Sequence, residues 1–513
     1  MIRNMTKAYE RVKNLDWDPT YITPEEKHVE PTRFFLPKKA VDPFKTFVRE
    51  YLTMEQEKDN RIMAVVEGGS RVQSATPDPR WMEGTKFALS NFAAIEYSGG
   101  RQMGRMVRVV APMELRQGYM MQALDEMRHT QLEMNVVRHH MRSWEDPAGF
   151  NIVLQGTGNN VGSGAFRAFI EDYSTSDAVE SSIALQVFTE IASTNILFVG
   201  LSTAAAQSGD NVMASAMLSI QSDECRHMAN GSATLMTLLN DDRNIPLLQQ
   251  VFDKWAWRAH MGIDVGMMLF ADYFVRNHTE SAKELSHRFY LEDFYGGFYK
   301  KLEKYGIKEP RFLPDIIRNI EWASHTAAVY IFGAWPLFYH RYDPIDEREM
   351  DWFEKKYPGW YSHYGKFWEA YKQMTEPDDG LLATKELGGL PAFCIVCQFP
   401  QIFPRPDAHI GVTVEKDGRT LSFCSPGCQW IYEQAPEHYT GVTFYSRYDG
   451  WDLADTAIDS GYVRGDGKTL MAQPGLNLKR MWTLDDLRRC HYEIVSPLRG
   501  KPGIPAPKRP GAA

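Results

Sequence analysis

The chain has 513 residues, of which 43% are hydrophobic, and its formal net charge is −9. This length predicts about two or three domains with a large buried core. The negative charge excludes nucleic acid as an expected partner. The first residues lack the apolar segment of an export signal, so we expect a cytoplasmic protein.

Three regions are expected along the chain. Residues 1–83 are rich in proline and charge, with one predicted helix at 43–66, and should form an extended or helical arm that contacts other subunits. Residues 84–340 should be almost entirely helical. Within them, residues 84–97 are predicted to be a buried helix whose single acidic side chain is Glu96.

One motif occurs twice in the helical region, as Asp-Glu-Met-Arg-His and Asp-Glu-Cys-Arg-His. Glu126 and His129 in the first copy, like Glu224 and His227 in the second, are three residues apart. On a helix both side chains then lie on one face and can hold one metal ion. Glu-x-x-His occurs four times in the chain, but only these two copies share the flanking Asp and Arg, which argues against chance.

The flanking residues have an expected role in such a site. A metal-bound histidine needs its other ring nitrogen held, often by a carboxylate. We expect Asp125 and Asp223 to hold the histidine of their own copy or of the other copy. Arg128 and Arg226 would neutralise these buried acids.

Residues 179–205 are nearly all apolar around Glu190. The run is long enough to span a membrane, but the central Glu190 and the lack of a following basic flank favour a buried helix. A lone acid on an apolar face is costly unless it is paired or binds metal. With Glu96, Glu190 completes the ligands of a dinuclear iron centre in a helical bundle.

Residues 341–513 are rich in aromatic and turn-forming residues and contain four clustered thiols. Two short-spaced pairs predict a structural zinc site, with an iron–sulfur cluster as the alternative, formed by Cys394, Cys397, Cys424 and Cys428. Cys225, inside the second motif, is expected to be a small core residue facing away from the metal. The tail at 500–513 is expected to be disordered.

The glycine-rich stretch 156–162 does not match a dinucleotide-binding fingerprint. Electrons for any redox reaction must therefore come from another protein.

In ligand order and cysteine cluster, the chain resembles the hydroxylase large (α) subunit of the soluble bacterial multicomponent diiron monooxygenases. This family includes methane, propane, alkene, toluene and phenol enzymes. Residues 355–361 and 461–470 are similar to propane-type members, and residues 394–428 to both phenol hydroxylases and propane-type enzymes.

The resemblance implies a mainly α, ferritin-like (ribonucleotide-reductase-like) four-helix diiron bundle, with extra helices and a small C-terminal zinc-binding region. It implies two iron ions per chain and a reaction that uses oxygen and NAD(P)H. The implied partners are a β subunit, with or without a γ subunit, a small coupling protein and an FAD/iron–sulfur reductase. A dimer of αβ(γ) units follows.

The expected substrate is a small hydrocarbon. The expected reaction is hydroxylation of a short-chain alkane or epoxidation of an alkene. Phenol or another arene is the alternative, and a non-catalytic diiron storage protein is the alternative from another class. By the resemblance, Thr194 would assist proton transfer and Asn195 would line a route to the surface. The expected pocket residues are Phe92, Glu133, Phe169, Tyr173, Phe198 and Ile220. Glu133 departs from the Cys or Gln of the family, and a ribonucleotide reductase would have Tyr there.

Overall fold

The chain is described here by a computed structural model. The residues that it describes are 31–41, 43, 46, 48–69, 78–110, 112–143, 164–329, 331–332, 344–373, 393–399, 411–416, 418–439, 448, 450–459 and 488. The sequence features at 1–30, 156–162, 461–470 and 500–513 lie outside these residues.

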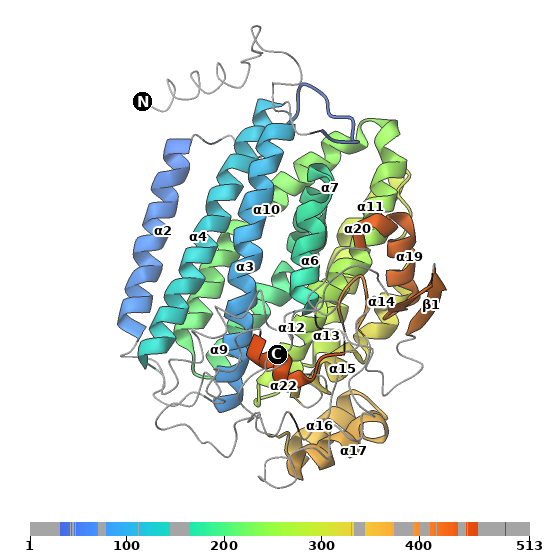
Figure 1. Ribbon diagram of the computed structural model, residues 1–513. Helices are drawn as coiled ribbons and strands as arrows, with labels where there is room; N and C mark the ends of the chain where they lie inside the picture. The colour runs from blue at the N-terminus through green and yellow to red at the C-terminus, as the bar shows by residue number, and fades with distance from the viewer. Residues whose placement is uncertain are drawn as a thin grey trace, which may run out of the picture.

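The described part of the chain is mainly helical, as predicted (Figure 1). Its first half is dominated by long helices that lie side by side. They are α2 (Val48–Gly68), α3 (Pro79–Val109), α4 (Met113–Ser143), α6 (Gly164–Thr175) and α10 (Asn211–Leu239). Helices α3 and α4 pack along much of their length, and α10 packs on α4. The expected helix at 43–66 corresponds to α2, and the one at 84–97 lies inside the longer α3.

Helix α3 begins earlier than predicted because the sequence provides a start signal. The Asp78 side chain accepts hydrogen bonds from the backbone N–H groups of Arg80 and Trp81, and Pro79 occupies the first helical position. Proline is favoured there because its missing N–H would have no helical partner.

The apolar run around Glu190 forms a continuous helical stretch, Ala178–Gln207, that alternates between α and π geometry. Its segments are α7 (Ala178–Ile183), η3 (Ala184–Ile191), α8 (Ala192–Thr194), η4 (Asn195–Gly200) and α9 (Leu201–Gln207). Among the described residues this stretch alone is long and apolar enough to cross a membrane, but 72% of its apolar window is buried. It is a core helix, and π turns such as η3 and η4 are frequent at functional sites.

The second half of the helical region covers this core. Its elements are η5 (Asp242–Asn244), α11 (Ile245–Ala259), η6 (His260–Asp264), α12 (Val265–Leu269), η7 (Phe270–Phe274), α13 (Ala282–Ser286), η8 (His287–Phe298), η9 (Tyr299–Tyr305), α14 (Leu313–Ile320) and α15 (Ala323–Val329). Helices α16 (Glu347–Lys356) and α17 (Trp360–Gln373) pack against each other at one end of the molecule (Figure 1).

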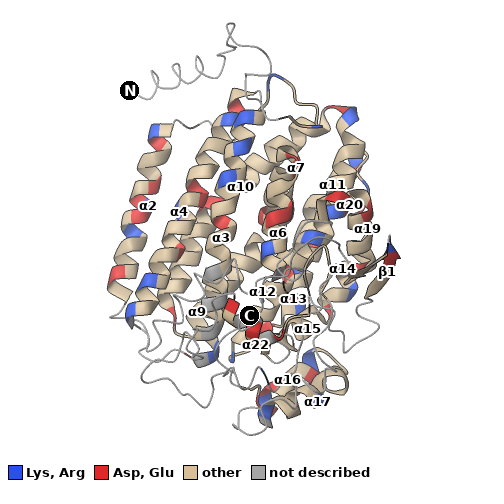
Figure 2. Ribbon diagram, in the orientation of Figure 1, with Lys and Arg blue, Asp and Glu red and all other residues tan. Residues whose placement is uncertain are grey.

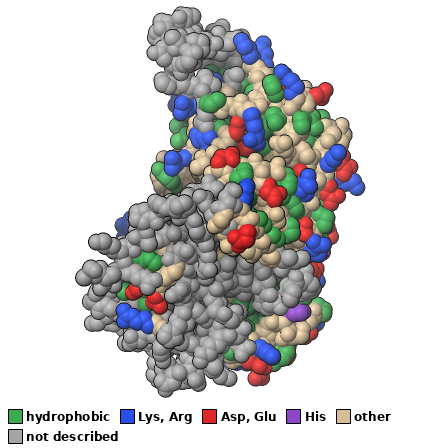
Figure 3. Space-filling model, turned by 45° about the vertical axis from the view of Figure 1, so that its right-hand side comes forward, with side chains coloured by type: hydrophobic (Ala, Val, Ile, Leu, Met, Phe, Trp, Pro, Cys, Tyr) green, Lys and Arg blue, Asp and Glu red, His purple; other side chains and the backbone are tan. Residues whose placement is uncertain are grey.

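The described residues between 411 and 439 form a small layer beside α11. Strands β1 (Val412–Lys416) and β2 (Arg419–Phe423) pair antiparallel, and Gly418 turns between them with a φ of 71°. This left-handed conformation favours glycine. Helices α19 (Pro426–Gln434), α20 (Pro436–Tyr439) and α22 (Leu453–Asp459) follow. On the face shown in Figure 3, hydrophobic side chains of the described residues are interspersed with charged ones.

Candidate metal centre

Four helical segments bring the six predicted metal ligands together. Helix α3 supplies Glu96, and η3 supplies Glu190. The Glu-x-x-His pairs come from α4 and α10, which pack on each other; α4 also packs on α3, and α10 on η3. All six side chains are buried, and both imidazoles have no exposed surface.

The Nδ1 atoms of the two histidines face the carboxylates. Nδ1 of His129 lies 3.3 Å from Glu96, 3.6 Å from Glu224 and 3.8 Å from Glu126. Nδ1 of His227 lies 3.2 Å from Glu224, 3.5 Å from Glu190 and 3.6 Å from Glu126. Each imidazole therefore presents one nitrogen to a group of carboxylate oxygens.

The donor atoms fit two metal ions. Glu96, Glu126 and His129 form one triad, and Glu126, Glu190 and His227 form another, with the donor atoms in each within 4.8 Å of one another. Glu126 belongs to both triads. One buried oxygen of Glu190 has no hydrogen-bond partner among the described residues, so it is free to bind a cation. Four carboxylates would balance the charge of two divalent ions.

Burial makes this cluster costly without metal. Burial raises the pKa of Glu126 well above its usual range and that of Glu190 to about 7. Although burial opposes the charged imidazole, the hydrogen bonds that His129 donates to Asp223 and Glu96 raise its pKa well above its usual range. Unpaired buried acids either hold protons or bind cations, and bound metal would replace the protons.

The outer nitrogens of the two histidines are held in a crossed arrangement. Nε2 of His129 donates to Asp223 over 3.1 Å, and Nε2 of His227 donates to Asp125 over 3.1 Å. Of the two pairings left open by the sequence, each Asp thus holds the histidine of the other motif copy. The N–H on Nε2 leaves the Nδ1 lone pair free for metal.

The two arginines of the motifs also pair across copies. Arg128 contacts Asp223 at 2.6 Å, and Arg226 contacts Asp125 at 3.0 Å. Arg226 also reaches Asp223 of its own copy at 2.9 Å. The duplicated motif therefore forms one interlocked network behind the two histidines. Cys225 points away from this network, but it is exposed, so its expected place in the core was wrong.

An apolar cavity adjoins the carboxylates. It has about 30 Å³ of water-accessible space and is lined by Phe92, Ile95, Glu96, Glu126, Leu185, Thr189, Glu190, Thr194, Leu197, Phe198, Glu224 and Ile263. Of the expected pocket residues, Phe92 and Phe198 line it, and so does Thr194. Asn195, next along the chain, is exposed, and its side chain accepts a hydrogen bond from Gln221 at 3.3 Å.

The other expected pocket residues are not among those that line this cavity. Phe169 packs against Tyr173 and edge-on against Trp255, with ring centroids 5.6 and 5.7 Å apart. Ile220 is buried in the core, and so is Glu133, neither of whose oxygens has a hydrogen-bond partner among the described residues.

Gln122 was missed from the sequence. Its amide donates to Glu190 over 2.8 Å and to Glu126 over 3.3 Å. It lies one turn before Glu126 on the same face of α4, and this four-residue spacing was the available signal. Ile263, from η6, carried no such signal because it is distant in sequence from all ligands.

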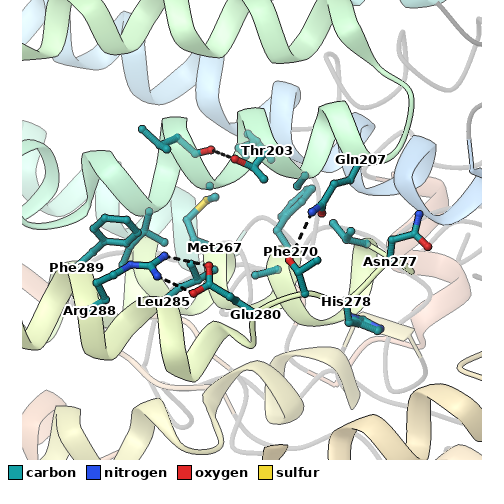
Figure 4. A pocket seen from close by; sticks show the side chains of 18 residues that line it. Thr203, Gln207, Met267, Phe270, Asn277, His278, Glu280, Leu285, Arg288 and Phe289 are labelled. Carbon is teal, nitrogen blue, oxygen red and sulfur yellow. Dashed lines mark hydrogen bonds and ion pairs between the residues drawn. The ribbon is translucent and has the colours of Figure 1, made fainter.

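A second cavity, of about 110 Å³, is lined by residues of η4, α9, α12 and η7 and by Arg288 and Phe289 (Figure 4). Ile196 of η4 and Met267 of α12 line it, whereas Leu197 of η4 and Ile263 of η6 line the cavity at the carboxylates. Among its lining residues, the Arg288 guanidinium forms a bidentate ion pair with the Glu280 carboxylate, with N···O distances of 2.6 and 3.0 Å.

The four clustered cysteines converge beside α11. Two come from the turn at 393–399, one follows β2, and one lies in the first turn of α19; all are buried, with sulfur atoms within 4.8 Å of one another. A zinc ion with bonds of about 2.3 Å would separate tetrahedral sulfurs by roughly 3.8 Å, so the cluster fits one ion. The Trp257 indole N–H points at the Cys428 sulfur, 3.3 Å away, and links the cluster to the bundle.

The fold and the paired Glu-x-x-His helices define a dinuclear carboxylate metalloprotein of the ferritin-like helical-bundle class. Residues 17–242 match the family model described as methane/phenol/alkene hydroxylase. The phenol hydroxylase structure from Pseudomonas sp. OX1 is similar in fold, with a TM-score of 0.76 and 24% identity, over 87% of this chain and 91% of that one.

Two relatives align over nearly their whole length. The propane 2-monooxygenase hydroxylase large subunit of Rhodococcus jostii (strain RHA1) is 36% identical, over 95% of this chain and 93% of the relative. The methane monooxygenase component A alpha chain of Methylococcus capsulatus (strain ATCC 33009 / NCIMB 11132 / Bath) is 28% identical, over 97% and 95%. The chain belongs to this family of diiron monooxygenase hydroxylase large subunits, as its motifs predicted. It is an oxidoreductase subunit that oxidises hydrocarbons within a multicomponent enzyme.

Proposed function

We propose that the chain binds two iron ions through Glu96, Glu126, His129, Glu190, Glu224 and His227 and oxidises a short-chain alkane or alkene beside them. The observation that carries this proposal is a pair of buried donor triads sharing Glu126 next to a small apolar cavity. Bound iron would pass on two electrons supplied by the reductase. Together with two protons and the two electrons of the oxidised hydrocarbon bond, they would reduce O2, so that one oxygen atom enters the hydrocarbon and the other leaves as water.

The chain's own groups prepare the reaction. Gln122 donates to Glu190 and Glu126 and so fixes the orientation of both carboxylates. Phe92 and Phe198 provide apolar walls for the cavity. Thr194, one turn after Glu190, places its hydroxyl at the cavity wall, where it assists proton transfer. Exposed Asn195 carries that route to the surface.

Cavity size and relatives favour a small substrate. A water molecule needs about 10–15 Å³ of such space, so a cavity of about 30 Å³ suits a substrate of a few heavy atoms. Its lining, apart from the four glutamates and two threonines, is apolar. The relatives at 36% identity are named propane 2-monooxygenase, whereas the phenol 2-monooxygenase oxygenase component of Pseudomonas sp. (strain CF600) is 28% identical. Phenol is the alternative substrate.

We also propose that Cys394, Cys397, Cys424 and Cys428 bind one structural zinc ion. Four buried thiolates leave no position open for a substrate. The ion would hold the C-terminal layer against α11 through Trp257.

The relatives are components of multicomponent enzymes, and the term large subunit implies a smaller one. In finer detail, we propose a β subunit, with or without γ, a small coupling protein and an FAD/iron–sulfur NADH reductase, acting on a cytoplasmic dimer of αβ(γ) units. Residues 1–83 would contribute subunit contacts.

The test is to reconstitute the iron-loaded hydroxylase with its partner proteins and give it propane, propene and phenol in parallel. We expect an alcohol from propane and an epoxide from propene. An apolar pocket distinguishes two substrates that differ by one methylene by only about 1–3 kcal/mol of transition-state binding free energy. Several small hydrocarbons should therefore be oxidised. Phenol turnover with neither of the other products would contradict the short-chain proposal and leave the iron site intact.

A matched pair of variants separates the iron site from general damage to α10. His227→Ala should lose iron and all turnover. Cys225→Ser, two residues earlier on the exposed face, should keep both. Iron uptake without oxygen-dependent product formation in the wild type would instead support a storage protein.

A further inference from the structure

Helix α2 lies outside the four ligand-bearing segments and packs on α4 and α10. Acidic and basic residues are interspersed along it (Figure 2). Three of its polar side chains, Tyr51, Glu55 and Lys58, are spaced by four and three residues, so they share one helix face. Tyr51 and Glu55 are buried, and Lys58 is half-buried. None of the three touches the proposed iron ligands.

Two of these side chains bind the acids that hold the histidines. The Tyr51 hydroxyl donates to Asp125, and also lies 3.1 Å from the Met121 carbonyl. The Lys58 ammonium forms an ion pair with Asp223. In each Asp–His pair behind the metal centre, the Asp carboxylate therefore also accepts a hydrogen bond or ion pair from a side chain of α2.

Glu55 connects both halves of the network. Its carboxylate lies 2.9 Å from Arg226, 3.5 Å from Arg128 and 3.2 Å from Lys58. These two arginines pair with Asp125 and Asp223. Glu55 thus contacts all three cations, Arg128, Arg226 and Lys58, that pair with the two aspartates.

The charge on these aspartates has a direct consequence for metal binding. A carboxylate that accepts the Nε2–H of a histidine raises the basicity of the other ring nitrogen. A cation or hydroxyl bound to the same carboxylate draws electron density away and weakens that effect. More negative surroundings favour the oxidised, more positive state of a metal, and more positive surroundings favour the reduced state.

We propose that Tyr51, Glu55 and Lys58 are positioning residues that set the iron affinity and the reduction potential of the dinuclear centre through Asp125 and Asp223. The inference rests on the proposed iron site. It extends the site to α2, a helix that provides no ligand.

The test is to measure iron affinity by chelator competition and the midpoint potential of the iron-loaded hydroxylase in charge variants of α2. Lys58→Met removes a positive charge and should lower the potential, whereas Glu55→Gln removes a negative charge and should raise it. We expect at least a tenfold change in the redox equilibrium constant, which is about 59 mV for one electron. By the same argument, iron affinity should rise in Lys58→Met and fall in Glu55→Gln, by up to about 10–100-fold.

Two controls separate tuning from loss of structure. Glu57→Gln makes the same charge change as Glu55→Gln on the solvent face of α2, where the side chain is 67% exposed, and should leave the potential unchanged. Lys58→Arg keeps the charge and should restore the wild-type potential. A structural effect alone would not shift Lys58→Met and Glu55→Gln in opposite directions.

The outcomes are distinct for the two proposals. Unchanged potentials, or shifts of the same sign in Lys58→Met and Glu55→Gln, overturn the role of α2. Failure of the wild type to bind iron overturns the proposed function itself. If Lys58→Met does not fold, Tyr51→Phe removes only a hydroxyl and should lower the potential by a smaller amount; no shift would then count against the proposal.

Discussion

Replacing Glu133 with leucine should stabilise the protein at alkaline pH. This side chain is fully buried on α4, one turn after His129, and neither oxygen has a hydrogen-bond partner among the described residues. Burial raises the pKa of Glu133 well above its usual range, and the nearby Glu96 carboxylate raises it further. The Glu133 carboxyl group therefore ionises at a higher pH in the folded protein than in the unfolded chain, where it is exposed to solvent.

The size and pH dependence follow from this environment. A buried polar group without a partner costs about 1–3 kcal/mol, which leucine at position 133 should recover as free energy of unfolding. Because the pKa is higher in the folded than in the unfolded state, there is a second, pH-dependent cost of keeping the buried carboxyl protonated, and this cost is absent below the unfolded value of about 4.3. It grows as pH rises toward the folded value. Glu133→Gln should therefore gain more over wild type at pH 8 than at pH 5.

The assay is thermal unfolding of the iron-loaded wild type, Glu133→Gln and Glu133→Leu at both pH values. Gln131→Leu, at an exposed position of the same helix, controls for the effect of leucine itself. A loss of stability in Glu133→Leu at pH 8 would show that the carboxylate has a favourable partner, and it would refute the reasoning.

Four further outcomes are expected. Cys424→Ser should lose zinc, from about one ion per chain, and lower the unfolding temperature; visible iron–sulfur absorption that depends on this thiol would overturn the zinc proposal. Thr194→Val should lower product formation by roughly 10²-fold, with Thr194→Ser close to wild type; equal rates would remove the hydroxyl from proton transfer. Asp223→Asn should weaken iron binding about 10–100-fold in chelator competition, and unchanged affinity would count against the crossed pairing. The isolated chain should not oxidise NADH, and steady hydroxylation without a reductase would contradict the need for partners.

The ligand set could be predicted because its signal is local. Three-residue spacing puts Glu126 and His129 on one helix face, and the duplicated flanking residues separate this pair from accidental ones. Glu96 and Glu190 could be found because each is an isolated acid in an apolar helix. The spacing, the flanking residues and the isolation of these acids can all be read without knowing how the helices pack.

The cavity could not be predicted in the same way because it depends on packing. Phe169 lies on a plausible helix face, but it packs against Tyr173 and Trp255. Ile263 lines the cavity only because tertiary packing brings η6 to the same cavity as the ligand-bearing segments. The π geometry of η3, which rotates Glu190 relative to a regular helix, has no signature in helix propensity.

The contribution of α2 was also hidden in the sequence. Tyr51, Glu55 and Lys58 lie in a charged helix whose composition is typical of a solvated surface, and only its packing on α4 and α10 places them behind the metal site. Cys225 shows the opposite error: a small residue inside the motif was expected in the core, but the face opposite the metal is open to solvent.

The most direct test of the central claim is the iron content of active hydroxylase, measured with its spectroscopic state. The account predicts about two iron ions per chain, magnetically coupled to each other. Glu126→Ala should lose both ions and all turnover, because this carboxylate belongs to both triads. Fully active protein with one iron or none, or full activity in Glu126→Ala, would contradict it.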